Sequence, residues 1–217
     1  MAQRNVQDGP SAATPENNQQ ADTDILILAF GDSLYAGYGV NQNQSLPAEL
    51  EKALRDAGLS VQVQNAGVSG DTTAAGLQRL AYTLDGLKRK PDLVLLGLGG
   101  NDMLRGLKPE DTRNNLADML NIFQQRGIPV LLTGMLAAPN LGQDYATAFN
   151  NIYPELAKKY AVGLYPFLLD GVITDRKLMQ ADHIHPTAEG IDKIVAKLAP
   201  QVEAMIDAQA SSDRAKN

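Results

Sequence analysis

Short apolar runs alternate along the chain with longer segments in which leucines recur three or four positions apart. The first run, Ile25 to Phe30, stops abruptly at Gly31-Asp32-Ser33. An apolar run of this length that ends at a glycine turn predicts a strand buried on both faces of a parallel sheet. Open α/β sheets place their ligands beside the carboxyl ends of such strands. The pattern therefore puts the Ser33 hydroxyl at the functional edge of the predicted sheet.

The same patterns predict strands and helices in alternation along the rest of the chain. Further strands are expected at residues 61–66, 92–98, 128–133 and 163–167. Helices are expected at residues 45–57, 110–126, 145–160 and 187–208, with Pro154 expected to kink or divide the third of these. One more helix follows the 67–73 loop, capped by Asp71 or Thr72, and its predicted buried stripe is Leu77, Leu80, Leu84 and Leu87.

This alternation predicts an α/β fold of about five parallel strands with helices on both faces and right-handed crossovers. We expect a single domain over residues 23–208 and a frayed tail over 209–217. Residues 1–22 are rich in Gln, Asn, Pro and Ser and are expected to form a disordered leader. This leader lacks the basic start and apolar core of a signal peptide, although it is compatible with the remnant of one.

The composition restricts the kinds of molecule that the protein is expected to bind. The net charge is −6 and no Lys/Arg cluster stands out, so a nucleic-acid surface is not expected. No apolar run is long enough for an integral membrane segment. The chain contains no cysteine, which excludes disulfides and cysteine-based metal sites.

Polar residues that could take part in catalysis follow several of the predicted strands. Ser33, Gly70 and Asn101 lie in three strand-end loops, and Asp182-His183-Ile184-His185-Pro186 forms a fourth loop near the C-terminus. A serine hydroxyl becomes a good nucleophile only when a base takes its proton, and His183 and His185 are the candidate bases. Asp182, three positions before His185, is suited to fixing the tautomer of that ring. The N–H groups of Ser33 and Gly70 and the Asn101 amide are donors of the kind that stabilise an oxyanion.

Each of these residues also has a simpler structural interpretation. A Gly-Asp-Ser after a strand is most often a turn or a helix cap. Asn101 and Gly70 could serve only to form turns. Asp182, His183 and His185 might together suggest a metal site, but three ligands so close in one loop strain the geometry, so no metal is expected.

Four sequence blocks resemble those of the SGNH/GDSL hydrolase family, in family order and at family-like spacing. They are residues 27–39 (ILAFGDSLYAGYG), 68–72 (VSGDT), 99–102 (GGND) and 182–186 (DHIHP). The nearest resemblance is to the small bacterial acyl-thioesterase, arylesterase and lysophospholipase group. It implies a flavodoxin-like three-layer α/β/α sandwich and a serine esterase that needs no cofactor. It also implies roles for five residues: Ser33 as nucleophile, His185 as base, Asp182 as its partner, and Gly70 and Asn101 as oxyanion donors with the Ser33 N–H.

The resemblance also implies where substrate binds. A mobile loop at residues 103–108 and the 136–141 loop should form opposite walls of the pocket, with Met103, Leu104, Leu107 and Pro139 as substrate-binding residues. The implied substrate is a small ester or thioester, such as an aryl or acyl ester, acyl-CoA or lysophospholipid. Alternatives are a carbohydrate O-deacetylase, an acyltransferase, or a flavodoxin-like binding module without enzymatic activity. The resemblance favours a periplasmic or secreted protein, with a cytoplasmic one still open, acting as a monomer or small homo-oligomer.

Overall fold

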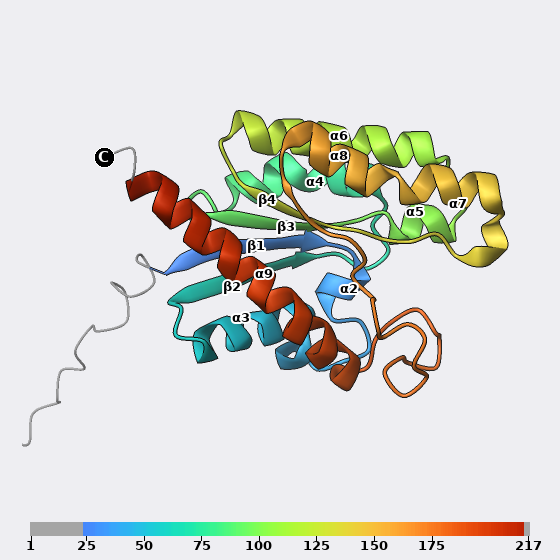
Figure 1. Ribbon diagram of the computed structural model, residues 1–217, viewed down its shortest axis with the longest axis horizontal. Coiled ribbons are helices and arrows are strands. Elements are labelled where there is room, and N and C mark those ends of the chain that lie inside the picture. The colour runs from blue at the N-terminus through green and yellow to red at the C-terminus, as the bar shows by residue number, and fades with distance from the viewer. Residues whose placement is uncertain (1–23, 215–217) are drawn as a thin grey trace, which may run out of the picture.

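A sheet of five parallel strands forms the centre of the computed structural model, which describes residues 24–214 (Figure 1). The strand order is β2-β1-β3-β4-β5, so the chain steps outward from β1 first on one side and then on the other. This order reverses direction between β1 and β3, which makes the carboxyl ends of these two strands the natural place for a site. The strand bounds are β1 Ile25–Gly31, β2 Val61–Gly67, β3 Leu93–Gly97, β4 Val130–Thr133 and β5 Gly163–Tyr165.

Helices cover both faces of this sheet. On one face, α3 (Leu46–Asp56) packs against α9 (Ala188–Arg214). On the other, α6 (Pro109–Gln125) packs between α4 (Thr73–Asp85) and α8 (Ile152–Tyr160), as Figure 1 shows. The predicted three-layer α/β/α sandwich of about five parallel strands is therefore confirmed.

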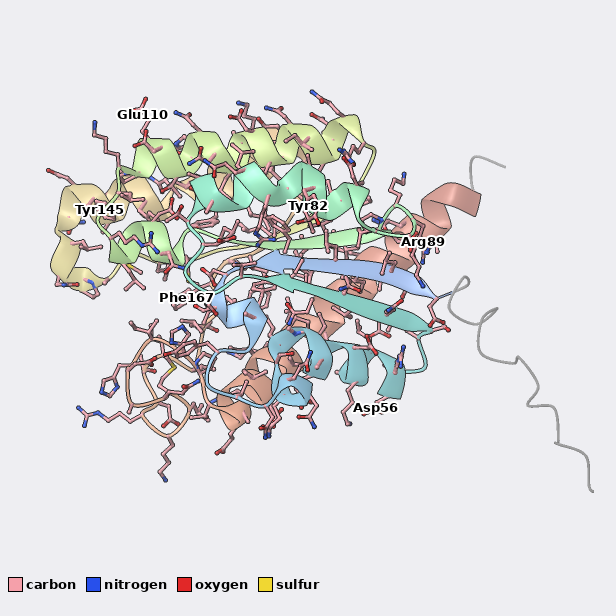
Figure 2. The ribbon with its side chains drawn as sticks, turned by 180° about the vertical axis from the view of Figure 1, so that it is seen from behind. Asp56, Tyr82, Arg89, Glu110, Tyr145 and Phe167 are labelled. Carbon is pink, nitrogen blue, oxygen red and sulfur yellow. The ribbon has the colours of Figure 1, made fainter. Side chains whose placement is uncertain are left out.

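Burial explains which apolar runs became central strands. Every residue of β3 and β4 is buried, and so is β1 from Leu26 onward, because helices cover both of their faces. The edge strand β2 instead alternates buried Val61 and Val63 with exposed glutamines. Outside this core, Tyr82 projects from the outer face of α4 (Figure 2) and is 84% exposed.

Three glycines form the flat surface, called here the seat, on which the segment that carries Ser33 packs. Gly67, Gly31 and Gly97 lie side by side at the carboxyl ends of β2, β1 and β3. The fully buried Tyr35 lies across them, and a Cβ on any of the three would collide with this residue. The Tyr35 hydroxyl reaches Thr133 Oγ1 at 2.8 Å. Tyr35 thus fixes the short helix α2 (Ser33–Ala36) on the sheet edge.

The helix predicted at residues 145–160 is divided in two. Helix α7 (Gln143–Asn150) ends and α8 begins at Ile152, so the break lies at Asn151. Pro154 stands in the first turn of α8, where its missing N–H is tolerated, whereas a continuous helix would set its ring against the Asn150 carbonyl. The prediction that Pro154 kinks or divides this helix is confirmed as a division.

The last helix is longer than predicted. Helix α9 continues to Arg214, beyond the expected end near Ala208, so residues 209–214 are helical where the sequence predicted a frayed tail. No glycine or proline stands in 209–214 to stop the helix. The predicted leader, 1–22, and the last three residues lie outside the described residues.

Short helices that the sequence did not predict surround the carboxyl edge of the sheet. They are α2, α5 (Gly100–Leu104) and two single 3-10 turns, η1 (Gln42–Gln44) and η2 (Pro139–Leu141). Among residues 24–214, no helix combines the length and the apolar character needed to cross a bilayer.

Candidate active site

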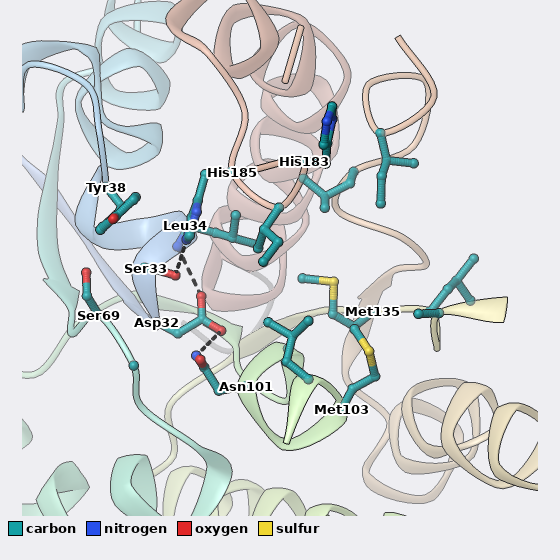
Figure 3. Close-up of a pocket in the computed structure, with 18 of the residues that line it drawn as sticks. Asp32, Ser33, Leu34, Tyr38, Ser69, Asn101, Met103, Met135, His183 and His185 are labelled. Atoms are coloured by element: carbon teal, nitrogen blue, oxygen red, sulfur yellow. Dashed lines mark hydrogen bonds between the residues drawn. The ribbon is translucent and has the colours of Figure 1, made fainter. Parts of the chain in front are cut away.

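A hydrogen-bonded line joins the three residues that the sequence proposed as a catalytic triad. Figure 3 shows the part of it between Ser33 and His185. Ser33 is the first residue of α2, whereas Asp182 and His185 lie in the loop that leads into α9. His185 Nε2 stands 2.8 Å from Ser33 Oγ, and His185 Nδ1 stands 2.6 Å from Asp182 Oδ2. The fold therefore brings together groups that are 152 positions apart in the chain.

The Asp182 carboxylate also shapes its own loop. Its second oxygen accepts hydrogen bonds from the backbone N–H groups of Ile184 and His185 at 3.0 and 3.1 Å. Desolvation raises the pKa of Asp182, but the hydrogen bonds from the His185 ring and from these two N–H groups outweigh it and lower the pKa to about 2. The group is therefore ionised at neutral pH and can stabilise a charged imidazole ring.

Gln180 connects the histidine loop to the segment that follows Ser33. Its side-chain amide donates to the Tyr38 carbonyl at 2.8 Å and to the Pro186 carbonyl at 2.9 Å. Its backbone N–H donates to the His185 carbonyl at 2.8 Å. The Tyr38 ring lies 4.3 Å from the His185 ring, centroid to centroid. These contacts orient the His185 ring toward the Ser33 hydroxyl.

The other histidine of this loop, His183, is not hydrogen-bonded to Ser33. Its ring points away from the Ser33 hydroxyl in Figure 3, at the mouth of the cavity. Its backbone has φ of +58°, in the left-handed region that disfavours side chains with a Cβ. The chain must turn sharply here because the next two N–H groups both donate to Asp182.

Relieving this backbone strain should stabilise the protein. We expect His183→Gly to raise the free energy of unfolding by about 0.5–1 kcal/mol, because the left-handed strain it removes exceeds the extra chain entropy of glycine. Urea unfolding followed by circular dichroism measures this change. His183→Ala, which keeps the Cβ, is the matched control and should show no gain. Equal stability of the two variants would contradict the strain argument.

The three predicted oxyanion donors line one cavity. Ser33, Gly70 and Asn101 all belong to its wall. Gly70 has φ of +86°, a conformation that a glycine adopts without strain. One hydrogen of the Asn101 amide is directed to the Asp71 carbonyl, at an Nδ2–O distance of 3.0 Å, and its Nδ2 lies 3.5 Å from Asp32 Oδ2. Ser33, Gly70 and Asn101 thus meet at one place, as the topology predicted.

The cavity itself measures about 400 Å³ and is mainly apolar. Of the four predicted substrate-binding residues, Met103 and Leu104 line it, and Leu107 and Pro139 do not. Leu107 lies beyond a turn at Gly106, whose φ is +62°, and its carbonyl accepts a hydrogen bond from the Tyr145 hydroxyl. Pro139 begins the η2 turn, so its neighbours Leu136 and Ala138 provide that part of the wall instead.

Part of the wall comes from residues that the sequence analysis missed. Met135 lies two residues after the end of β4, and its position near the carboxyl end of a central strand was a usable signal. Phe167 is the last residue of the strand predicted at 163–167, but β5 ends at Tyr165, so Phe167 lies just beyond it. Leu169 and Ile173 follow in a segment without regular periodicity, where nothing in the sequence set them apart. Figure 2 shows Phe167 at the carboxyl end of the sheet, on the same side as Tyr145.

Asp32, next to Ser33, is a buried carboxyl group that the sequence analysis did not use. It is 3% exposed, and its side chain accepts a hydrogen bond from the Leu34 N–H, which caps α2. Burial raises the pKa of Asp32 to about 6, with further increases from Asp102 and Asp71, against opposing effects of the Leu34 hydrogen bond and His185.

This shift predicts a pH-dependent stability. The folded protein holds a proton on Asp32 that the unfolded chain releases, so the free energy of unfolding should fall as the pH rises from about 4 to about 6. A shift of this size corresponds to about 3 kcal/mol. Asp32→Asn keeps an oxygen for Leu34 and should flatten this part of the curve in urea unfolding. An unchanged slope would contradict the assignment. Asp182, whose pKa is lowered, acts with the opposite sign and only below pH 4.

Within residues 24–214, no three His, Asp or Glu side chains gather in a way that could hold a metal ion. The charged and polar groups of the site instead contact one another or the backbone.

Comparison with known proteins identifies the family. Residues 29–193 match the GDSL-like Lipase/Acylhydrolase family. An arylesterase of Vibrio mimicus is 42% identical over 170 residues, which are 78% of this chain and 83% of that protein. The thioesterase 1/protease 1/lysophospholipase L1 of Escherichia coli strain K12 is 36% identical over 181 residues, 83% of this chain and 85% of that protein.

A solved structure agrees with these relatives. The crystal structure of AlinE4, described as an SGNH-hydrolase family esterase, is 51% identical and superposes with a TM-score of 0.72. The match covers 84% of this chain and 96% of AlinE4. The resemblance inferred from four motifs is confirmed, and the chain belongs to the GDSL-like lipase/acylhydrolase family.

Proposed function

We propose that this serine esterase hydrolyses carboxylic esters or thioesters through an acyl-enzyme formed on Ser33. The observation that carries the proposal is the continuous hydrogen-bonded line from Ser33 through His185 to Asp182, which opens into an apolar cavity. A hydroxyl within hydrogen-bonding reach of a base, itself oriented by a carboxylate, is the arrangement expected for an activated nucleophile.

In the first half-reaction, Ser33 Oγ attacks the carbonyl carbon of the substrate and its proton passes to His185 Nε2. Asp182 stabilises the resulting imidazolium through Nδ1, at 2.6 Å. The tetrahedral intermediate collapses when the carbon–oxygen or carbon–sulfur bond breaks and His185 gives its proton to the leaving group. In the second half-reaction, His185 removes a proton from water, which attacks the acyl-enzyme and releases the acid and Ser33.

The developing oxyanion requires donors that are already in place. The Ser33 and Gly70 N–H groups and the Asn101 amide are the proposed donors. Asn101 Nδ2 contacts the Asp71 carbonyl at 3.0 Å and Asp32 Oδ2 at 3.5 Å, so the hydrogen on the longer contact is the one proposed to turn to the oxyanion. Removing one such donor typically costs about 3–4 kcal/mol of transition-state stabilisation.

The cavity favours substrates with an apolar acyl or aryl group. Apolar side chains from five separate segments face it, and a volume of about 400 Å³ accommodates a group of that size. The relatives named as an arylesterase and a thioesterase/lysophospholipase support aryl esters, acyl-CoA and lysophospholipids as the substrate classes to test.

The test is a fluorophosphonate probe followed by mass spectrometry of the labelled peptide. We expect a single adduct on Ser33, and competition by p-nitrophenyl esters. Absence of labelling, or labelling at another serine, would contradict the proposed nucleophile. A panel of aryl esters, acyl-CoA, lysophospholipid and acetylated sugars should show greatest turnover with the apolar esters. Preference for acetylated sugars, or acyl transfer to an added alcohol in place of hydrolysis, would instead identify a deacetylase or an acyltransferase.

We also propose a periplasmic or secreted location and a monomer or small homo-oligomer, as the family resemblance implies. Immunoblotting of cell fractions from the source organism tests the first, with detection only in the cytoplasm as the contrary result. Light scattering of the purified protein tests the second.

A further inference from the structure

The side chain of Arg79, on α4, joins two segments of the proposed active site. Its Nε donates to the Asp71 carboxylate at 2.6 Å, and its terminal NH2 group donates to the Gly31 carbonyl at 3.0 Å. Gly31 ends β1 two residues before Ser33, and Asp71 directly follows Gly70. One guanidinium group therefore spans the segment of the proposed nucleophile and the segment of a proposed oxyanion donor.

Asp71 also contacts Asn101, the third of the proposed oxyanion donors. Its side chain holds Arg79, while its backbone carbonyl accepts the hydrogen bond from Asn101 Nδ2 at 3.0 Å. This bond, together with the longer 3.5 Å contact from Asn101 Nδ2 to Asp32 Oδ2, determines which way the amide faces. A displacement of Asp71 would therefore move both Gly70 and Asn101 relative to Ser33.

The surroundings of Arg79 distinguish its ion pair with Asp71 from an ordinary surface ion pair. The Arg79 and Asp71 side chains are only 21% and 12% exposed. The guanidinium carbon lies 4.0 Å above the centroid of the Phe30 ring, on the strand that leads to Ser33. A planar group with two fixed acceptors and an aromatic face beneath it has one orientation, which lysine cannot reproduce.

We propose that Arg79 is a positioning residue for the oxyanion hole: through Asp71 and Gly31 it sets the spacing between Ser33 and the Gly70–Asn101 donors. The inference rests on the proposed function, but it concerns a residue that lies outside the cavity wall. Arg79 touches no substrate and acts through the groups it holds.

The effect of losing Arg79 should therefore appear in kcat. Misplacement of reacting groups by about 1 Å can cost roughly 100-fold in rate, so we expect Arg79→Met to lower kcat on p-nitrophenyl acetate by roughly 10- to 100-fold. KM should change little because the apolar wall is untouched. Arg79→Lys should recover part of the loss, since an ammonium group can reach one of the two acceptors.

Arg126→Met is the matched control. Arg126 also pairs with an aspartate, Asp85, at 2.7 Å, but it does so on the exposed surface at the end of α6. This variant should keep the kcat of the unmodified enzyme, which shows that loss of an Arg–Asp pair alone does not reduce turnover.

A double-variant cycle separates positioning from a general structural role. If Arg79 acts through Asn101, the kcat loss from Arg79→Met should be several-fold smaller in an Asn101→Ala background than in the native enzyme. The pH profile of kcat/KM should not shift, because the Ser33–His185–Asp182 line is not altered. Asp71→Asn, which weakens the same contact from the other side, should reproduce the effect and replaces Arg79→Met if that variant does not fold.

Three results would overturn the inference: native kcat in Arg79→Met or in Asp71→Asn, losses from Arg79→Met and Asn101→Ala that simply multiply, or a rise in KM without a fall in kcat. Each of them leaves the proposed function intact as long as the fluorophosphonate adduct stays on Ser33. Failure of that labelling would instead count against the proposed function itself, so the two failures are distinguishable.

Discussion

Ser33→Ala should reduce kcat for p-nitrophenyl ester hydrolysis by roughly 10⁶-fold, to the residual rate that the binding site alone provides. The reason is that no other hydroxyl is hydrogen-bonded to His185 in the described residues; Ser33 Oγ lies 2.8 Å from its Nε2. The fold should persist, since α2 is capped by Asp32 and seated by Tyr35 rather than by the serine side chain. Steady-state kinetics and thermal unfolding measure the two effects.

The same experiment has an internal control. His185→Ala should cost about as much as Ser33→Ala, and the double variant should be no worse than either, because residues that act as one unit give non-additive losses. Turnover in Ser33→Ala above a few per cent of the native rate would contradict the proposed nucleophile.

Asp182→Asn should lower kcat by roughly 10³- to 10⁴-fold while leaving the loop in place. The amide oxygen can still accept the hydrogen bonds from Ile184 and His185 that shape the turn, but the amide nitrogen cannot accept a hydrogen bond from His185 Nδ1–H. The ring would then be held in the wrong tautomer, with its proton on Nε2 facing Ser33.

Comparison with Asp182→Ala sharpens this prediction. The alanine variant loses the turn as well as the negative charge, so it should unfold at lower urea concentration than Asp182→Asn. A pH–rate profile completes the measurement. If Asp182→Asn keeps more than about a tenth of the native kcat, Asp182 does not control the His185 tautomer.

Much of the fold was predictable because its core strands have little ambiguity. The runs that became β1 and β3 are apolar and bounded by polar or glycine positions, and buried parallel strands require such runs. The convergence of Ser33, Asn101 and His185 followed from topology, because carboxyl ends of parallel strands share one edge. Helix limits were less certain, since α9 meets no stop signal after Ala208.

The cavity wall was predicted only in part, for a physical reason. Leu169 and Ile173 lie in a segment without helical or strand periodicity, so its path depends on contacts with distant elements rather than on local pattern. The role of Arg79 was hidden for a related reason. Its partners, Asp71 and the Gly31 carbonyl, are 8 and 48 positions away, and neither contact leaves a local pattern.

The close packing of Tyr35 on Gly31, Gly67 and Gly97 divides the protein into positions that can vary and positions that cannot. A side chain at Gly31, Gly67 or Gly97 would collide with Tyr35 or Ala36 and displace the short helix that begins at Ser33. The apolar lining, in contrast, comes mainly from residues 103–104, 135–138 and 167–173, none of which provides the nearest atoms to these three glycines. In laboratory evolution toward substrates with new acyl groups, active variants should therefore carry substitutions in these three stretches but keep glycine at positions 31, 67 and 97.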